Sequence, residues 1–122
     1  KRALPLPVSV PSHCSLMKPA ADQLATALQN ITLHTPQIRV IHNADVAAYH
    51  NAEQIKDALV RQLYCPVRWT ETVNTLVSEG ITESAECGPG KVLAGLAKRI
   101  NKAANCSALT NAEQVSAFIA DH

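Results

Sequence analysis

Several residue types and patterns are scarce in this sequence, and each scarcity excludes a class of protein. Aromatic side chains make up only 3% of the 122 residues, so a core has to be aliphatic, drawn from a hydrophobic fraction of 47%. Lys and Arg (11 residues) nearly balance Asp and Glu (10 residues), and the net charge of +1 gives no electrostatic case for binding nucleic acid. The apolar runs are too short to cross a bilayer, so we expect no membrane segment.

Cysteine pairs with the spacing of metal sites are also missing. No CxxC or CxxH pair occurs, so we expect no metal site. The apolar stretch near the start is broken by Pro5 and Pro7, which argues against a signal peptide. We therefore expect a cytoplasmic protein with four reduced thiols, mostly buried as small apolar residues: Cys14, Cys65, Cys87 and Cys106.

Strand and helix patterns alternate along the chain. This alternation predicts the α/β class, with a mostly parallel sheet and flanking helices. The expected strands are 2–10, 38–41, 81–87 and 106–109. The expected helices are 13–30, one that begins at the cap Asn51, 69–78 ending at Gly80, 91–101, and one that begins at Asn111.

Apolar spacing also predicts which side of two helices is buried. In the helix over 13–30, the expected inward stripe is Leu16, Ala20, Leu24, Ala27, Leu28 and Ile31. In the helix over 91–101, it is Val92, Leu93, Leu96 and Ile100.

A histidine follows the first apolar run and stands out as a candidate base. Pro11 ends the run, Ser12 is a candidate N-cap, and His13 then falls in the first turn of a helix. The positive end of the helix dipole favours the neutral imidazole there, and a neutral imidazole suits a general base. The alternative is that His13 only caps the turn.

Two further segments carry distinctive sequence. Residues 60–69, VRQLYCPVRW, are a helix end followed by a proline turn, and residues 86–96 read ECGPGKVLAGL. The GPGK in the second segment is not a P-loop, because Val92 follows Lys91 where Ser or Thr is required. Its glycines instead predict a tight turn from a strand into a helix.

These segments, with KRALPLPVSVPSHCSLMKPAADQL at 1–24, resemble bacterial malonyl-CoA:acyl-carrier-protein transacylases in order and spacing. The resemblance covers essentially the whole chain but only the C-terminal part of that family's proteins, so we expect a fragment. It implies that residues 1–10 are the last strand of a small ferredoxin-like subdomain. Residues 11–122 would then be the C-terminal part of a large α/β-hydrolase-like acyltransferase subdomain.

The resemblance also implies an activity and site residues. His13 would be the general acid/base, the main-chain carbonyl of Gln62 would orient it, and Ser12 would contact substrate. The parent enzyme would transfer malonyl from CoA to the phosphopantetheine thiol of acyl carrier protein in fatty acid biosynthesis, with no cofactor, because malonyl-CoA is a substrate. The family's serine nucleophile lies in a GHSxG elbow, and no GxSxG occurs here, so we expect this chain alone to be inactive.

Partners follow from the same resemblance. Acyl carrier proteins are acidic, so basic residues could dock one; the candidates are Lys1, Arg2, Lys98 and Arg99. Two other functions stay open: a polyketide-type acyltransferase domain, and a non-enzymatic interaction fragment. Exposed strands of a fragment could also pair two copies into a dimer.

Overall fold

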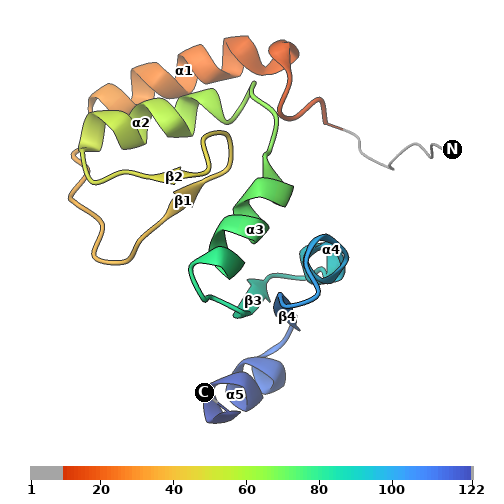
Figure 1. The fold of residues 1–122 in the computed structure, drawn as a ribbon. Helices are drawn as coiled ribbons and strands as arrows, with labels where there is room; N and C mark the ends of the chain where they lie inside the picture. Colours follow the sequence, from red (N-terminus) through yellow and green to blue (C-terminus); the bar gives the residue numbers. More distant parts are fainter. Residues whose placement is uncertain (1–9, 122) are drawn as a thin grey trace, which may run out of the picture. The chain divides into compact units, whose positions relative to one another are not determined.

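The computed structural model describes residues 10–121. These residues fall into two compact units, one that ends at Arg68 (unit 1) and one that begins at Trp69 (unit 2). Each is an arrangement of short helices and strands (Figure 1). The strand expected over 2–10, and with it the subdomain assigned to 1–10, falls almost wholly outside the described residues.

Unit 1 is built on two helices that pack side by side, α1 (Lys18–Gln29) and α2 (Ala52–Arg61) (Figure 1). Asn51 caps α2 as predicted, because its side-chain oxygen accepts hydrogen bonds from Glu53 N at 2.8 Å and Gln54 N at 3.4 Å. The two helices bury small and aliphatic side chains: Ala21, Leu28, Ile55 and Ala58.

The start of the first helix differs from the prediction. A 3₁₀ turn, η1 (Ser15–Met17), precedes α1, and the N-cap positions are Cys14 for η1 and Met17 for α1, so Ser12 is not a helix cap. The predicted apolar stripe is also partly wrong, since Leu16 is 72% exposed and Ile31 is 46% exposed. Both lie outside α1, where the spacing of an α-helix no longer applies. Ala27 is exposed as well, although it lies within α1.

A short antiparallel hairpin completes unit 1. Its strands are β1 (Ile41–His42) and β2 (Ala47–Ala48), and the turn between them includes Val46 with φ 54°. The strand predicted over 38–41 is wrong except at its last residue, because Ile38 is 81% exposed and Val40 is 53% exposed outside any ladder. β-Branched residues raise strand propensity, but they form a strand only where a partner strand lies alongside.

Unit 2 contains a strand–helix–strand motif. Strands β3 (Glu83–Cys87) and β4 (Asn105–Leu109) pair in parallel, and α4 (Val92–Ile100) connects them. Helix α3 (Trp69–Ser78) precedes the motif, and α5 (Ala112–Asp121) follows it. This parallel pair, with the helices around it, confirms the predicted α/β class.

The core of unit 2 is small. Val73, Ala97 and Ala104 are buried, with Trp69, Val77, Ile100 and Cys106 packed against them. The inward stripe predicted for α4 is wrong at three of its four residues, because Val92 is 68% exposed, Leu93 is 40% exposed and Leu96 is 38% exposed. A sheet of two strands is narrow, so the helix buries Ala97 against it and leaves much of its other apolar surface uncovered.

The cysteines depart from the prediction as well. All four are free thiols, but three are half-buried and Cys87, at the end of β3, is exposed. None is fully buried. Cys14 and Cys65 lie outside the helices and strands, and Cys106 packs against the core of unit 2.

Candidate active site

The candidate site in unit 1 is centred on a histidine in an unusual backbone conformation. His13 lies in a turn before η1, with φ 62°, in the left-handed region that residues other than glycine seldom occupy. Its backbone N–H donates to the carbonyl of Leu63 at 2.9 Å. His13 is therefore not in the first turn of a helix, and the helix-dipole argument made from the sequence does not apply to it.

The imidazole of His13 is held by a main-chain carbonyl. Its Nδ1 lies 2.7 Å from the carbonyl oxygen of Gln62. A carbonyl oxygen can only accept, so this hydrogen bond requires a proton on Nδ1. In the neutral ring, Nε2 then carries the lone pair, which is the arrangement a general base needs.

Gln62 can supply its carbonyl because of its position at a helix end. It is the C-cap residue of α2, and its own N–H donates to Ala58 O at 3.1 Å. The last carbonyls of a helix have no partner within the helix, so they are available to side chains from elsewhere. The family resemblance implied an orienting role for the backbone of this residue, and the structure shows the contact of its carbonyl with His13.

A shallow cavity of about 190 Å³ opens beside the histidine. It is lined by Ser12, His13, Met17, Gln62 and Leu63. His13 and Ser12 are both exposed, so each is accessible from solvent. The structure thus brings Ser12, His13 and Gln62 together around one cavity.

An ion pair between Asp45 and Arg61, the residue before Gln62, was not found from the sequence. The guanidinium of Arg61 binds the carboxylate of Asp45 through two hydrogen bonds, Nη1 to Oδ1 at 2.5 Å and Nη2 to Oδ2 at 2.7 Å. The hydrogen bonds from Arg61 hold the pKa of Asp45 below its ordinary value of 3.8 and outweigh the effect of burial. Asp45 and Arg61 lie 16 positions apart, and no local spacing rule connects them.

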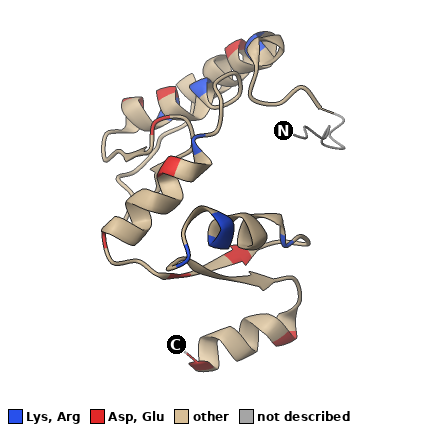
Figure 2. Cartoon of the chain, turned by 45° about the vertical axis from the view of Figure 1, so that its right-hand side comes forward, with Lys and Arg blue, Asp and Glu red and all other residues tan. Residues whose placement is uncertain are grey.

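The candidate docking residues are only partly described. Lys98 and Arg99 are exposed in the last turn of α4, where basic side chains also suit the helix dipole (Figure 2). Lys1 and Arg2 lie outside the described residues.

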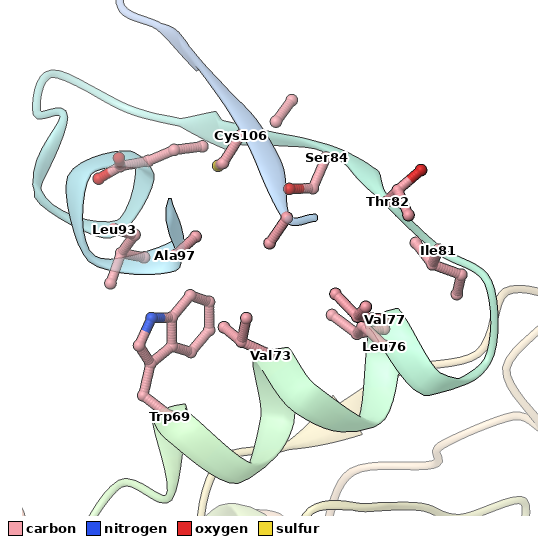
Figure 3. A pocket seen from close by; sticks show the side chains of 13 residues that line it. Trp69, Val73, Leu76, Val77, Ile81, Thr82, Ser84, Leu93, Ala97 and Cys106 are labelled. Carbon is pink, nitrogen blue, oxygen red and sulfur yellow. The ribbon is translucent and has the colours of Figure 1, made fainter. Parts of the chain in front are cut away.

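A second cavity, of about 230 Å³, lies in unit 2. Apolar side chains of α3 and α4 point into it, among them Trp69, Val73 and Leu93 (Figure 3). Trp69 Nε1 is buried without a hydrogen-bond partner among the residues the structure describes. The carboxylate that lines this cavity, Glu86, accepts from Ala94 N at 2.8 Å, so it satisfies the N-terminus of α4. This explains the acidic residue before GPGK in structural terms.

Other kinds of site find no support. Within residues 10–121, no three His, Cys, Asp or Glu side chains gather as ligands for a metal ion. The helices in this range are also too short, or too polar, for one of them to cross a bilayer.

Comparison with known proteins gives close matches. No protein-family profile matches the chain. The malonyl CoA-acyl carrier protein transacylase of Haemophilus influenzae is 63% identical over 100 residues, which are 82% of this chain and 32% of that protein. The transacylase of Escherichia coli K12 is 54% identical over 119 residues, 98% of this chain and 38% of that protein.

Solved structures agree with these relatives. An acyl carrier protein S-malonyltransferase from Vibrio cholerae matches with a TM-score of 0.87 and 55% identity, over 97% of this chain and 39% of that one. The malonyl-transacylase solved in complex with a type II PKS acyl-carrier protein matches with a TM-score of 0.91 and 50% identity, over 100% of this chain and 40% of that one.

The fold of this chain is therefore similar to part of the solved malonyltransferase structures. More specifically, the chain is homologous to malonyl CoA-acyl carrier protein transacylases, which confirms the resemblance found in the sequence. It spans about 38% of the length of the E. coli relative.

Proposed function

We propose that this chain supplies the general base of an enzyme that transfers a malonyl group from CoA to the phosphopantetheine thiol of acyl carrier protein in fatty acid biosynthesis. The observation that carries the proposal is the 2.7 Å contact between His13 Nδ1 and the Gln62 carbonyl, in a chain 54% identical to the E. coli transacylase. The carbonyl does for His13 what an aspartate does in a Ser-His-Asp triad.

In the first half-reaction, His13 Nε2 takes the proton of a serine hydroxyl as the serine oxygen attacks the malonyl thioester carbon. The carbon–sulfur bond then breaks, and the CoA sulfur takes the proton from Nε2 as it leaves. The product is a malonyl ester on the serine.

In the second half-reaction, His13 again takes a proton from the attacking group and then gives it to the leaving group. His13 Nε2 takes the proton of the phosphopantetheine thiol as its sulfur attacks the ester carbon. The carbon–oxygen bond breaks, and the serine oxygen takes the proton back. This is ping-pong transfer between two thiols, and it needs no cofactor because malonyl-CoA is a substrate.

The serine nucleophile is the part of this scheme that the chain does not offer. No GxSxG motif occurs in the sequence, and Ser12, the serine beside the histidine, is not in an elbow between a strand and a helix. We propose a substrate-contacting role for Ser12, since it lines the same cavity as His13. The 122-residue chain by itself should therefore form no malonyl adduct.

We also propose that Lys98 and Arg99 help to dock the acidic carrier protein in the cytoplasm. Their support is exposure and charge, and the carrier-protein complex of the relative with 50% identity. In a chimera in which this chain replaces the matching residues of the E. coli relative, changing both residues to Ala should raise the KM for acyl carrier protein and leave the KM for malonyl-CoA unchanged. An unchanged KM for the carrier protein would remove the two residues from the docking surface.

The type II PKS carrier protein in that complex also favours a second candidate, transfer to a polyketide carrier protein. The chemistry at His13 is the same in both cases, and only the docking partner differs. Comparing kcat/KM for a fatty-acid and a polyketide carrier protein separates the two. Two further alternatives involve no acyl transfer. An interaction fragment without activity predicts binding to a partner, and a dimer through exposed strands predicts a doubled mass.

The direct experiment is a replacement in the E. coli relative, whose 119 matching residues are exchanged for those of this chain. The resulting chimera should transfer malonyl from CoA to acyl carrier protein. Changing His13 to Ala in the chimera should lower kcat/KM by about 10²–10⁴-fold, which is typical of a lost general base.

The matched control is His34→Ala, because His34 is also an exposed histidine of unit 1 but does not line the cavity. It should leave kcat/KM within about twofold. The proposal fails if the folded chimera is inactive, or if the His13 and His34 variants are equally active.

A further inference from the structure

Unit 1 contains a network of charged and polar side chains around Arg61, the residue that precedes Gln62 in the chain. At its centre, the planar fork of Arg61 meets both oxygens of Asp45. The hydroxyl of Tyr49 donates to Asp45 Oδ2 at 3.0 Å, and Arg61 Nε donates to Asp57 at 2.6 Å. The side chains of Asp45 and Arg61 are 15% and 29% exposed, so solvent competes little for their mutual hydrogen bonds.

Arg61 connects this network to the site through its position in the chain. It is the last residue of α2 and immediately precedes Gln62. Its carbonyl accepts from Tyr64 N at 3.1 Å and Cys65 N at 2.9 Å, so it also shapes the segment after the helix. Helix ends fray when nothing outside the helix holds them, and the Asp45 carboxylate holds this one from the hairpin turn.

The hairpin turn is tied to the same segment by three further hydrogen bonds. Asn43 Nδ2 donates to the side-chain oxygen of Gln62 at 3.4 Å, and the Asn43 carbonyl accepts from Arg68 N at 2.9 Å. Arg68 Nη1 donates to the carbonyl of Asp45 at 3.3 Å. The contacts therefore reach both ends of the segment 62–68, whose first residues hold His13.

The backbone of the turn is itself strained, which indicates that its shape is needed. Val46 has φ 54°, and a β-branched residue is a clear outlier in that region. Strain of this kind persists only where surrounding contacts fix the conformation. Here the N–H groups of Asp45 and Val46 both donate to His42 O, at 3.3 Å and 3.0 Å.

We propose that Asp45 and Arg61 are positioning residues that hold the Gln62 carbonyl in place and thereby fix the Nδ1–H form and orientation of the His13 imidazole. A shift of about 1 Å at the carbonyl would break a 2.7 Å hydrogen bond and free the ring to rotate or change tautomer. The catalytic effect of this positioning rests on the function proposed above, but its effect on the tautomer and orientation of His13 does not.

The test uses two measurements on Asp45→Asn and Arg61→Lys. The first is the tautomer of His13 in the chain itself, read from the ring ¹⁵N signals of histidine-labelled protein and assigned by the His13→Ala variant. The second is kcat and KM in the chimera with the E. coli relative. Asp57→Asn is the matched control, because Asp57 also binds Arg61 but is 63% exposed and does not reach the turn.

We expect both variants to raise the fraction of His13 with its proton on Nε2. We also expect kcat to fall by about 10-fold, the lower end of the losses seen when groups that orient metal-binding histidines are removed, with KM for malonyl-CoA nearly unchanged. Asp57→Asn should change neither measurement by more than about twofold. Arg61→Lys keeps the positive charge and the helix propensity. It therefore tests the two hydrogen bonds from the guanidinium to Asp45 even if Asp45→Asn unfolds unit 1.

Two results would overturn the proposal: folded variants with a wild-type His13 tautomer, or an Asp57→Asn variant with the same effect as the other two. An inactive wild-type chimera would overturn the proposed function alone, since the tautomer measurement on the chain still decides the positioning role.

Discussion

The Asp45–Arg61 ion pair should stabilise unit 1 in a manner that depends on pH. Exposed ion pairs contribute about 0–1 kcal/mol, whereas breaking a fully buried pair costs about 3–5 kcal/mol. The side chains of Asp45 and Arg61 are 15% and 29% exposed and form two hydrogen bonds, so the contribution of this pair to stability should lie between these limits. Asp45→Asn should therefore lower the free energy of unfolding of unit 1 by about 2 kcal/mol at pH 7.

The sign of the pH dependence follows from the carboxylate. Arg61 lowers the pKa of Asp45 below 3.8 in the folded state, so the pair contributes fully above the pKa of the unfolded chain. The contribution is lost as pH falls through the lower, folded pKa. The difference between the wild-type chain and Asp45→Asn should accordingly be constant from pH 7 to pH 5 and shrink as pH falls below 3.8.

Urea denaturation followed by the NMR amide signals of α2 measures this quantity for unit 1 alone. Residue-resolved signals are needed because two compact units need not unfold together. Asp57→Asn, at a 63% exposed position on the same arginine, should cost no more than about 1 kcal/mol. A loss for Asp45→Asn that is equally large at pH 7 and at pH 2 would refute the electrostatic explanation.

Three further changes test single interactions by urea denaturation followed by amide signals of the affected helix. Glu86→Ala removes the carboxylate that accepts from Ala94 N and should lower the free energy of unfolding by about 2 kcal/mol. The control Glu113→Ala, in the exposed first turn of α5, should lower it by less than about 0.5 kcal/mol. Equal losses would contradict the capping role of Glu86. Asn51→Ala should destabilise α2 by about 1 kcal/mol, and no loss would mean that the cap is not formed. Gly80→Ala should cost about 1 kcal/mol through backbone strain at φ 85° alone, because no atom lies within 4 Å of the added Cβ; a neutral result would contradict that conformation.

Elements with a local signal at both ends could be predicted from the sequence. Helix α3 has the bounds expected for it, since Gly80 ends it with the positive φ that terminates helices. Helix α2 follows from its cap, Asn51. In these cases the residues that decide the structure are neighbours in the chain.

Features that depend on distant residues were missed. The two-residue strands β1 and β2 exist because they pair with each other, and Ile38 and Val40, with equal strand propensity, have no partner strand. The sequence predicts a helix at the turn around His13, because the apolar pattern there continues that of α1. The conformation of this turn instead depends on a hydrogen bond to Leu63 O, 50 residues further on.

The candidate site likewise combines a feature that has a local sequence signal with features that depend on distant residues. His13 is visible as a histidine after a proline, but nothing in residue spacing links it to Gln62; that link came from resemblance to a family. The Asp45–Arg61 pair had neither kind of signal, and only the folded hairpin brings the two side chains together.

The tautomer of His13 in the wild-type chain shows directly whether the Gln62 carbonyl orients this histidine. Ring ¹⁵N signals, recorded at a pH where the imidazole is neutral, distinguish a proton on Nδ1 from a proton on Nε2. The hydrogen bond to the Gln62 carbonyl predicts the proton on Nδ1 and the lone pair on Nε2. A neutral ring with its proton mainly on Nε2 would contradict the hydrogen bond, and with it the role of His13 as the base.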